Sequence, residues 1–303
     1  MRVGIDLGGT KIEFIALGDN GSVLARHRIP SPQHQYQKTL NTIKDGVDAL
    51  ETKLGKRGSI GIGIPGTISP HTGLVKGANS TWLIGNPIDR DLEEMFGRPV
   101  RVANDANCFA LSEATDGSGA GFNVVFGVIL GTGVGGGLCV NRELLQGRNG
   151  IAGEWGHSPM PQGNSGAPEE PPNVRKCYCG RQNCIETFLS GPAFSLSFFE
   201  QNNIDLTAHQ IVERLNANDK SAHAAIETYE KQLARALAGV INIIDPDIIV
   251  LGGGMSNIAR LYETVPNLWQ EWCFSDRVDT LLKPPQHGDS SGVRGAAWLW
   301  PID

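Results

Sequence analysis

Four residues of the types that bind zinc lie close together in the middle of the sequence. Cys177, Cys179 and Cys184 fall within eight residues, and His157 lies upstream in the segment GEWGH at 153–157. Three thiolates and one imidazole fill all four positions of a tetrahedral zinc ion, which makes such a site structural. The spacing is not that of a standard zinc finger, and free thiols are the alternative. We predict a structural Zn²⁺ site formed by these four residues.

The segment DLGGTK at 6–11 combines a carboxylate, two glycines, a hydroxyl and an amine. Asp6 ends a strand pattern, and such a carboxylate can hold hydrated Mg²⁺. The glycines let backbone N–H groups approach phosphate oxygens, while Thr10 and Lys11 can add hydrogen bonds and charge. The segment matches neither the P-loop nor the Rossmann pattern. A glycine turn in a plain hairpin is the alternative.

Two more glycine turns follow predicted buried strands, GTGVGGG at 131–137 and GGGM at 252–255. The second precedes a predicted helix, whose N-terminus offers N–H groups to an anion. Each turn alone could simply serve packing. Three such turns at strand ends, in two similar halves of the chain, together predict a bound nucleotide.

Three further carboxylates lie beside these motifs. Asp105 follows a short strand pattern in the segment NDAN, where Asn and Asp are also preferred helix caps. The functional interpretation is that Asp105 accepts a hydroxyl proton during phosphoryl transfer. Glu154 and Glu186 flank the predicted zinc ligands and could bind sugar hydroxyls; simple solvent exposure is the alternative for both.

These residues must be positioned by a folded, globular chain. Its 303 residues suggest two domains, and the 39 glycines gather in clusters. A net charge of −6, from 26 basic and 32 acidic residues, argues against a nucleic-acid partner. The longest near-continuous apolar run, Val124–Leu130, is too short to span a membrane. The N-terminus has no secretory pattern, so we expect a cytoplasmic protein with reduced thiols.

The periodicity of apolar residues predicts an α/β chain. Strand patterns alternate with amphipathic helices, of which 36–54 and 222–244 are the clearest, and the tail from 292 to 300 is a further helix. The openings GIDLGG, from Gly4, and GVILGT, from Gly127, align, as a duplicated domain would. We predict a small domain at 1–120, completed by a C-terminal helix at about 290–303, and a large domain at 121–289 that carries the zinc loop.

The motifs together resemble the ROK family of sugar kinases and repressors, over essentially the whole chain. The resemblance is carried by the segments GIDLGGTK at 4–11, NDANC at 104–108, LGTGVGGGL at 130–138, GEWGH at 153–157, CYCGRQNCIE at 177–186, LGGGMS at 251–256 and GDSSGVRGAA at 288–297. It implies the duplicated fold shared by actin and hexokinase: two α/β domains with a nucleotide and sugar cleft between them.

The resemblance also implies a reaction and its residues. A hexose and ATP, with Mg²⁺, would give a hexose 6-phosphate and ADP, with Asp105 as general base and a homodimer as the assembly. The residues implied to bind the sugar are Asn79, Asn104, Asp105, Glu154, His157 and Glu186. The residues implied to bind the nucleotide are Gly4, Ile5, Asp6, Leu7, Gly8, Gly9, Thr10, Lys11, Gly131, Thr132, Gly133, Val134, Gly135, Gly136, Gly137, Gly253 and Gly254.

Within the family, the chain looks most like the bacterial fructokinases that also accept mannose. The segments ANSTWL at 78–83 and GEWGHSPMP at 153–161 carry that likeness. Trp82 and Trp155 would leave little room for an N-acetyl group if they face the sugar. We therefore expect fructose as the best acceptor. The alternatives are an N-acetylglucosamine or N-acetylmannosamine kinase, or a sugar-sensing protein that has lost catalysis.

Overall fold

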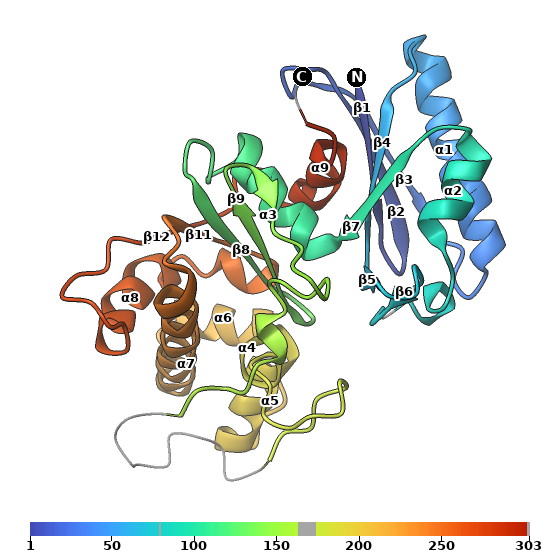
Figure 1. The fold of residues 1–303 in the computed structure, drawn as a ribbon. Coiled ribbons are helices and arrows are strands. Elements are labelled where there is room, and N and C mark those ends of the chain that lie inside the picture. The colour runs from blue at the N-terminus through green and yellow to red at the C-terminus, as the bar shows by residue number, and fades with distance from the viewer. Residues whose placement is uncertain (79, 163–173, 302–303) are drawn as a thin grey trace. The chain divides into compact units, whose positions relative to one another are not determined.

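The computed structural model describes residues 1–78, 80–162 and 174–301, and its chain divides into two compact units (Figure 1). Unit 1 comprises Met1–Gly121, Gly137–Ala152 and Gln286–Asp303. Unit 2 comprises Phe122–Gly136 and Gly153–Pro285. Unit 1 thus includes residues 137–152, which the sequence-based boundaries assign to the second domain.

Unit 1 is built on a five-stranded mixed sheet in the order β3-β2-β1-β4-β7. The first three strands are antiparallel neighbours, whereas β1, β4 and β7 run parallel. The strands are β1 (Arg2–Leu7), β2 (Lys11–Leu17), β3 (Val23–Pro30), β4 (Ser59–Ile64) and β7 (Val100–Asn104), and a small separate hairpin pairs β5 (Thr67–Ile68) with β6 (Val75–Lys76).

Helices cover both faces of this sheet (Figure 1). They are α1 (Tyr36–Leu54) and α2 (Ile88–Phe96) on one face, and α3 (Asp105–Asp116) and α9 (Ser291–Trp298) on the other. The predicted helix at 36–54 is therefore confirmed, and the predicted tail helix belongs to unit 1.

The side chains of β1 alternate between the two faces of the sheet, so this strand contributes both to the hydrophobic core and to the predicted phosphate segment. Val3, Ile5 and Leu7 are buried in the core cluster that includes α1 residues. Gly4, on the opposite face, lies under α9, where a Cβ would be only 2.1 Å from the carbonyl oxygen of Val293. Successive strand residues point to opposite faces, so Asp6 shares the α9 face with Gly4.

The second sheet repeats this plan in the order β10-β9-β8-β11-β12. As β1 pairs with β4, β8 pairs in parallel with β11, which pairs in parallel with β12. The strands are β8 (Val124–Leu130), β9 (Val134–Val140), β10 (Glu143–Leu144), β11 (Ile248–Gly252) and β12 (Leu281–Lys283). The duplication predicted from the two aligned openings is confirmed by this shared strand order.

Unit 2 adds a larger set of helices. They are α4 (Glu186–Leu189), α5 (Gly191–Asn202), α6 (Ala208–Asn216), α7 (Lys220–Ile244) and α8 (Leu261–Leu268). The long α7 begins at an Asp219 cap that accepts hydrogen bonds from Ser221 N and Ala222 N, and fourteen of its residues are buried. In the part of the chain that the structure describes, no helix has the length and apolar character needed to cross a bilayer.

Candidate active site

Two carboxylates lie at the same edge of the unit 1 sheet. Asp6 of β1 is in register with Gly63 of β4, and Gly63 with Ala103 of β7. Asp105 follows β7 and begins α3. Burial, followed by the negative charges of Asp105 and then Glu13, raises the pKa of Asp6 to about 7. The positive charges of Lys11 and Arg28 offset this rise only in part, and the two carboxylates offer the oxygen ligands that a divalent cation such as Mg²⁺ prefers.

The N-cap of α3 is Asn104, not Asp105. The Asn104 side chain accepts a hydrogen bond from Ala106 N at 2.9 Å and donates one to the carbonyl oxygen of Gly66 at 3.0 Å. The predicted sugar ligand Asn104 therefore has an amide already engaged within unit 1. Asp105 occupies the first helical position, is exposed, and accepts from Ala106 N at 2.8 Å. Its carboxylate is positioned at the sheet edge without serving as the cap.

Of the predicted phosphate segment at 4–11, only its second half reaches the surface. Gly4, Ile5 and Leu7 are buried in the sheet, whereas Gly9, Thr10 and Lys11 are exposed. The turn closes through a hydrogen bond from Gly8 N to Lys11 O at 3.0 Å. Its backbone is thus available to an anion next to Asp6. Asn79, implied to bind the sugar, lies outside the described residues.

The glycine segment at 131–137, which belongs to unit 2 as far as Gly136, contributes mostly to packing. Gly136 lies under Trp155, where a Cβ would be 2.6 Å from the indole Cδ1, and Trp155 Nε1 donates to Gly135 O at 3.0 Å. Gly137 and Val134 are buried. Gly133 leaves room for a carboxylate of Glu186, since a Cβ at Gly133 would be 2.5 Å from Oε2. Only the start of the segment faces open space.

That start, Gly131-Thr132, lines a pocket of about 750 Å³ at the carboxyl ends of β8 and β11. Gly254 lines it from the other strand end, and Gly253, with φ +80°, allows a close approach to Leu130 O. The pocket is lined by Leu130, Gly131, Thr132, Gly191, Pro192, Ser195, Asp205, Leu206, Thr207, Ala208, His209, Val212, Gly254, Met255, Asn257 and Ile258. Its size and position at strand ends suit a nucleoside.

Sequence reasoning missed the wall of this pocket formed by α5 and α6. Two helix-start signals were present. Ser190 precedes Gly191-Pro192 and accepts a hydrogen bond from Ala193 N, and Thr207 forms a capping box with Gln210. Helix N-termini at a strand edge would have indicated a ligand-facing wall.

The four predicted zinc ligands do come together. The ligand atoms of His157, Cys177, Cys179 and Cys184 all lie within 4.8 Å of one another. Cys179 Sγ is 3.6 Å from Cys184 Sγ, and His157 Nδ1 is 3.6 Å from Cys177 Sγ. A tetrahedral zinc with bonds of about 2.3 Å places its sulfur ligands roughly 3.8 Å apart, so the donors fit the ion.

Local structure favours this arrangement. Arg181 N–H hydrogen-bonds the Cys179 sulfur and thereby lowers the pKa of that thiol. Gly180, with φ +87°, turns the chain so that Cys177 N donates to Arg181 O at 2.9 Å. His157 Nδ1 faces the sulfurs, while its Nε2 is 3.1 Å from the hydroxyl of Tyr178. A second hydrogen bond of this kind orients a metal-binding imidazole.

The two glutamates predicted to bind sugar differ in how firmly they are held. One oxygen of Glu186 accepts from Val134 N at 3.0 Å, and the other lies 3.8 Å from Cys177 Sγ. Glu186 is therefore fixed between the glycine segment and the cysteine cluster. Glu154 is exposed and precedes the single helical turn Trp155–His157, with its carbonyl oxygen accepting from His157 N at 3.2 Å.

The tryptophan argument against an N-acetyl group fails at Trp155. Its side chain is 7% exposed, packs edge-on against Phe126 with centroids 6.0 Å apart, and donates to Gly135 O. An indole held in the core of unit 2 does not restrict the substituents of a sugar. Trp82 belongs to unit 1. It is partly buried, packs against the hydrophobic core of that unit and lies edge-on to His34.

Comparison with known proteins gives one consistent result. A sequence profile described as the ROK family matches residues 2–302. The chain is 39% identical over 306 residues to an N-acetyl-D-glucosamine kinase of Pasteurella multocida, with 99% of each chain covered.

Solved structures agree in fold. A ROK hexokinase of Thermus thermophilus superposes with a TM-score of 0.85 at 27% identity, covering 98% of this chain and 96% of that one. A ROK glucokinase of Streptomyces griseus, solved with glucose and AMPPNP, gives a TM-score of 0.78 at 26% identity, with 98% of each chain covered.

Proposed function

Since the chain belongs to the ROK family, we propose that it is an ATP-dependent kinase that phosphorylates N-acetyl-D-glucosamine. The observation that carries the choice of sugar is the full-length similarity to the N-acetyl-D-glucosamine kinase of Pasteurella multocida. The buried position of Trp155 removes one of the two steric reasons for expecting fructose. The fructose preference has no support beyond two short segments, and we do not retain it.

The proposed reaction transfers the γ-phosphoryl group of ATP to the C6 hydroxyl of the sugar. Asp105 takes the hydroxyl proton as that oxygen bonds to phosphorus and the bond to the leaving ADP oxygen breaks. Mg²⁺ beside Asp6, when bound, neutralises charge on the phosphates. The exposed backbone at Gly9, Thr10 and Lys11 contacts phosphate oxygens. These roles are supported by the sheet-edge location of both carboxylates.

Unit 2 supplies the remaining proposed roles. The pocket lined by Thr132 and Gly254 holds the adenosine, and Glu154, His157 and Glu186 bind sugar hydroxyls. Zinc, held by His157 and the three cysteines, has a structural role: it keeps Glu186 and the Glu154 segment in place. The family resemblance alone supports a homodimer, which sedimentation velocity of the purified chain tests.

The choice of sugar is tested by ADP release with N-acetylglucosamine, N-acetylmannosamine, glucose, mannose and fructose. We expect kcat/KM to be highest for N-acetylglucosamine, at least about tenfold above fructose, because buried polar groups penalise a sugar that leaves them unpaired. Glucose is the matched control, since it differs at one substituent. A higher kcat/KM for fructose than for N-acetylglucosamine would contradict the proposed sugar substrate but not the proposed kinase activity. ADP release with none of them would favour the sugar-sensing alternative.

The nucleotide pocket is tested by filling it. Ala208 lines the pocket at the start of α6, so Ala208→Trp should raise the KM for ATP by about tenfold or more while leaving sugar affinity unchanged. Ala217→Trp, at the other end of the same helix and outside the pocket, is the matched control. An unchanged KM for ATP in Ala208→Trp would place the adenosine elsewhere.

A further inference from the structure

Unit 1 contains a fully buried carboxylate outside the proposed site. Glu113, on α3, is 0% exposed. Its Oε2 accepts hydrogen bonds from Ser118 N at 2.9 Å and Gln286 N at 3.0 Å, and its Oε1 accepts one from the Ser291 hydroxyl at 2.7 Å. A buried carboxylate is tolerated only when its oxygens are hydrogen-bonded. Glu113 therefore connects the end of α3, next to Ser118, to the C-terminal segment that contains Gln286 and Ser291.

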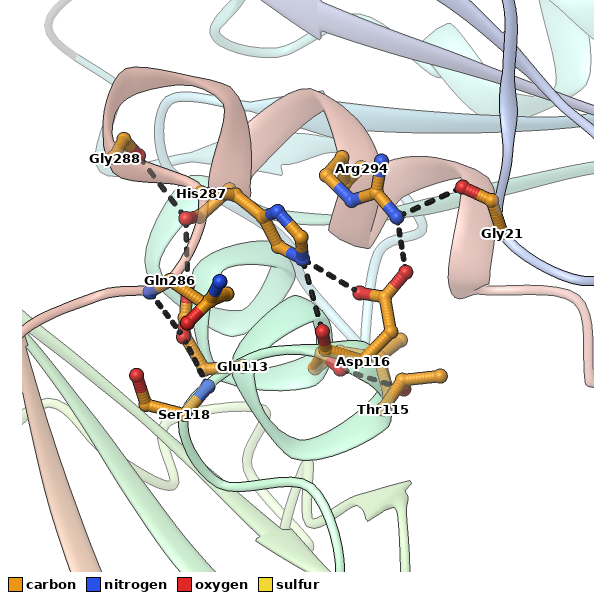
Figure 2. Close-up of polar contacts among 11 residues, drawn as sticks. Gly21, Glu113, Thr115, Asp116, Ser118, Gln286, His287, Gly288 and Arg294 are labelled. Atoms are coloured by element: carbon orange, nitrogen blue, oxygen red, sulfur yellow. Dashed lines mark hydrogen bonds and ion pairs between the residues drawn. The ribbon is translucent and has the colours of Figure 1, made fainter.

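The neighbouring Asp116 adds a second connection between α3 and the C-terminal segment (Figure 2). Arg294 of α9 donates to Asp116 Oδ2 and, at 3.0 Å, to the carbonyl oxygen of Gly21. His287 Nε2 lies 3.2 Å from Asp116 Oδ1. The two helices also cross closely, since a Cβ at Gly295 would be 1.6 Å from Cys108 O. These contacts hold α9 firmly against α3.

The start of α9 is what approaches the proposed metal site. Ser291, which Glu113 holds, is the first residue of α9, and Gly292 follows it. A Cβ at Gly292 would lie 3.5 Å from Asp6 Oδ2, so the first turn of α9 adjoins the Asp6 carboxylate. The backbone N–H groups of a helix's first turn carry partial positive charge. A displacement of this turn would change both the atoms packed against Asp6 and the partial positive charge near its carboxylate.

We propose that Glu113 is a positioning residue for the cation site. By fixing Ser291 and Gln286, Glu113 holds the first turn of α9 beside Asp6, and thereby determines where Asp6 meets the divalent cation of the nucleotide. The inference rests on the proposed kinase function, in which Asp6 acts on that cation. Glu113 touches neither sugar nor nucleotide; it acts through α9.

The test measures cation binding directly, with Mn²⁺ as the probe. The affinity of the ADP-bound protein for Mn²⁺ is read from the electron paramagnetic resonance signal of free Mn²⁺. In Glu113→Gln, the side-chain NH₂ group faces N–H or O–H donors that the carboxylate oxygen accepts from in the wild type, so those hydrogen bonds are lost. We expect the Mn²⁺ affinity to fall about 10–100-fold, as when the partner of a metal ligand is removed. Ser291→Ala removes one hydrogen bond and should lower the affinity by about threefold to tenfold.

Glu230→Gln is the matched control. Glu230 is likewise buried, at 1% exposed, and its carboxylate accepts two hydrogen bonds from Arg260 in unit 2. This variant should lose thermal stability while keeping the wild-type Mn²⁺ affinity. The KM for the sugar should stay within about a factor of two of the wild-type value in all three variants. A positioning role changes the affinity for the cation alone, whereas loss of the fold would change sugar binding as well.

The outcomes separate the two proposals. Unchanged Mn²⁺ affinity in Glu113→Gln, with only a lower Tm, would overturn the positioning role. If Glu113→Gln does not fold, Ser291→Ala decides by the same measurement, and wild-type affinity there overturns the role. A wild-type protein that phosphorylates no sugar contradicts the proposed function, whereas an active wild type with unaffected variants contradicts only the role of Glu113.

Discussion

Asp105→Asn is expected to lower kcat by about 10²–10⁴-fold, the typical loss when a general base is removed. The substitution is well suited to the question because Asn104, not Asp105, caps α3. The Asn side chain keeps an oxygen that can accept from Ala106 N, as Asp105 Oδ1 does at 2.8 Å, but it cannot take up the hydroxyl proton. The variant should therefore fold normally and bind both substrates.

Steady-state kinetics, calorimetric sugar binding and thermal denaturation together check this expectation. Asp48→Asn is the control, because Asp48 is an exposed helical aspartate on α1 whose partner, Lys44, lies on the same helix. We expect the control to match the wild type in all three measurements. If Asp105→Asn retained kcat within a few-fold of wild type, the role of Asp105 as base would be lost, and the carboxylate would be a feature of the helix start.

The elements that could be predicted from sequence are those with a clear period. The apolar positions of α1 and α7 repeat at helical spacing, and these helices begin and end within two residues of the predicted ranges. In α5 the signal is weaker: Phe198 is buried, but Leu196 and Phe199, on either side, are 44% and 43% exposed. A helix with apolar residues on more than one face has no amphipathic pattern to detect.

The candidate site was predicted best where side-chain chemistry restricts the options. A Cys₃His set has one common use, and its four members do converge. Glycine and tryptophan are less informative, because both serve packing as readily as binding. Gly136 and Trp155 belong to functional-looking motifs, yet the structure has them in contact with each other in the core. Sequence cannot tell which face such a residue presents, and the expectation of fructose depends in part on Trp155 facing the sugar.

Cys179→Ser is expected to abolish zinc binding and to lower the Tm markedly. Apparent zinc-binding free energies of about 10–16 kcal/mol contribute directly to folding in small zinc domains, so loss of one ligand should cost several degrees at least. Cys179 is the most accessible of the three cysteines, being only half-buried, so the new hydroxyl introduces little strain. Elemental analysis of protein purified without chelator should give one zinc per chain for the wild type and almost none for the variant.

The kinetic consequence should be specific, because the cluster adjoins one proposed substrate more closely than the other. Glu186 is fixed between Val134 N and Cys177 Sγ, and releasing the cysteines should loosen this proposed sugar ligand. The adenosine pocket is lined by none of the four zinc ligands. We therefore expect sugar KM to rise by about tenfold or more while ATP KM changes little. Cys273→Ser, at a half-buried cysteine outside the cluster, should keep both zinc and activity; a wild type that contains no zinc would refute the site itself.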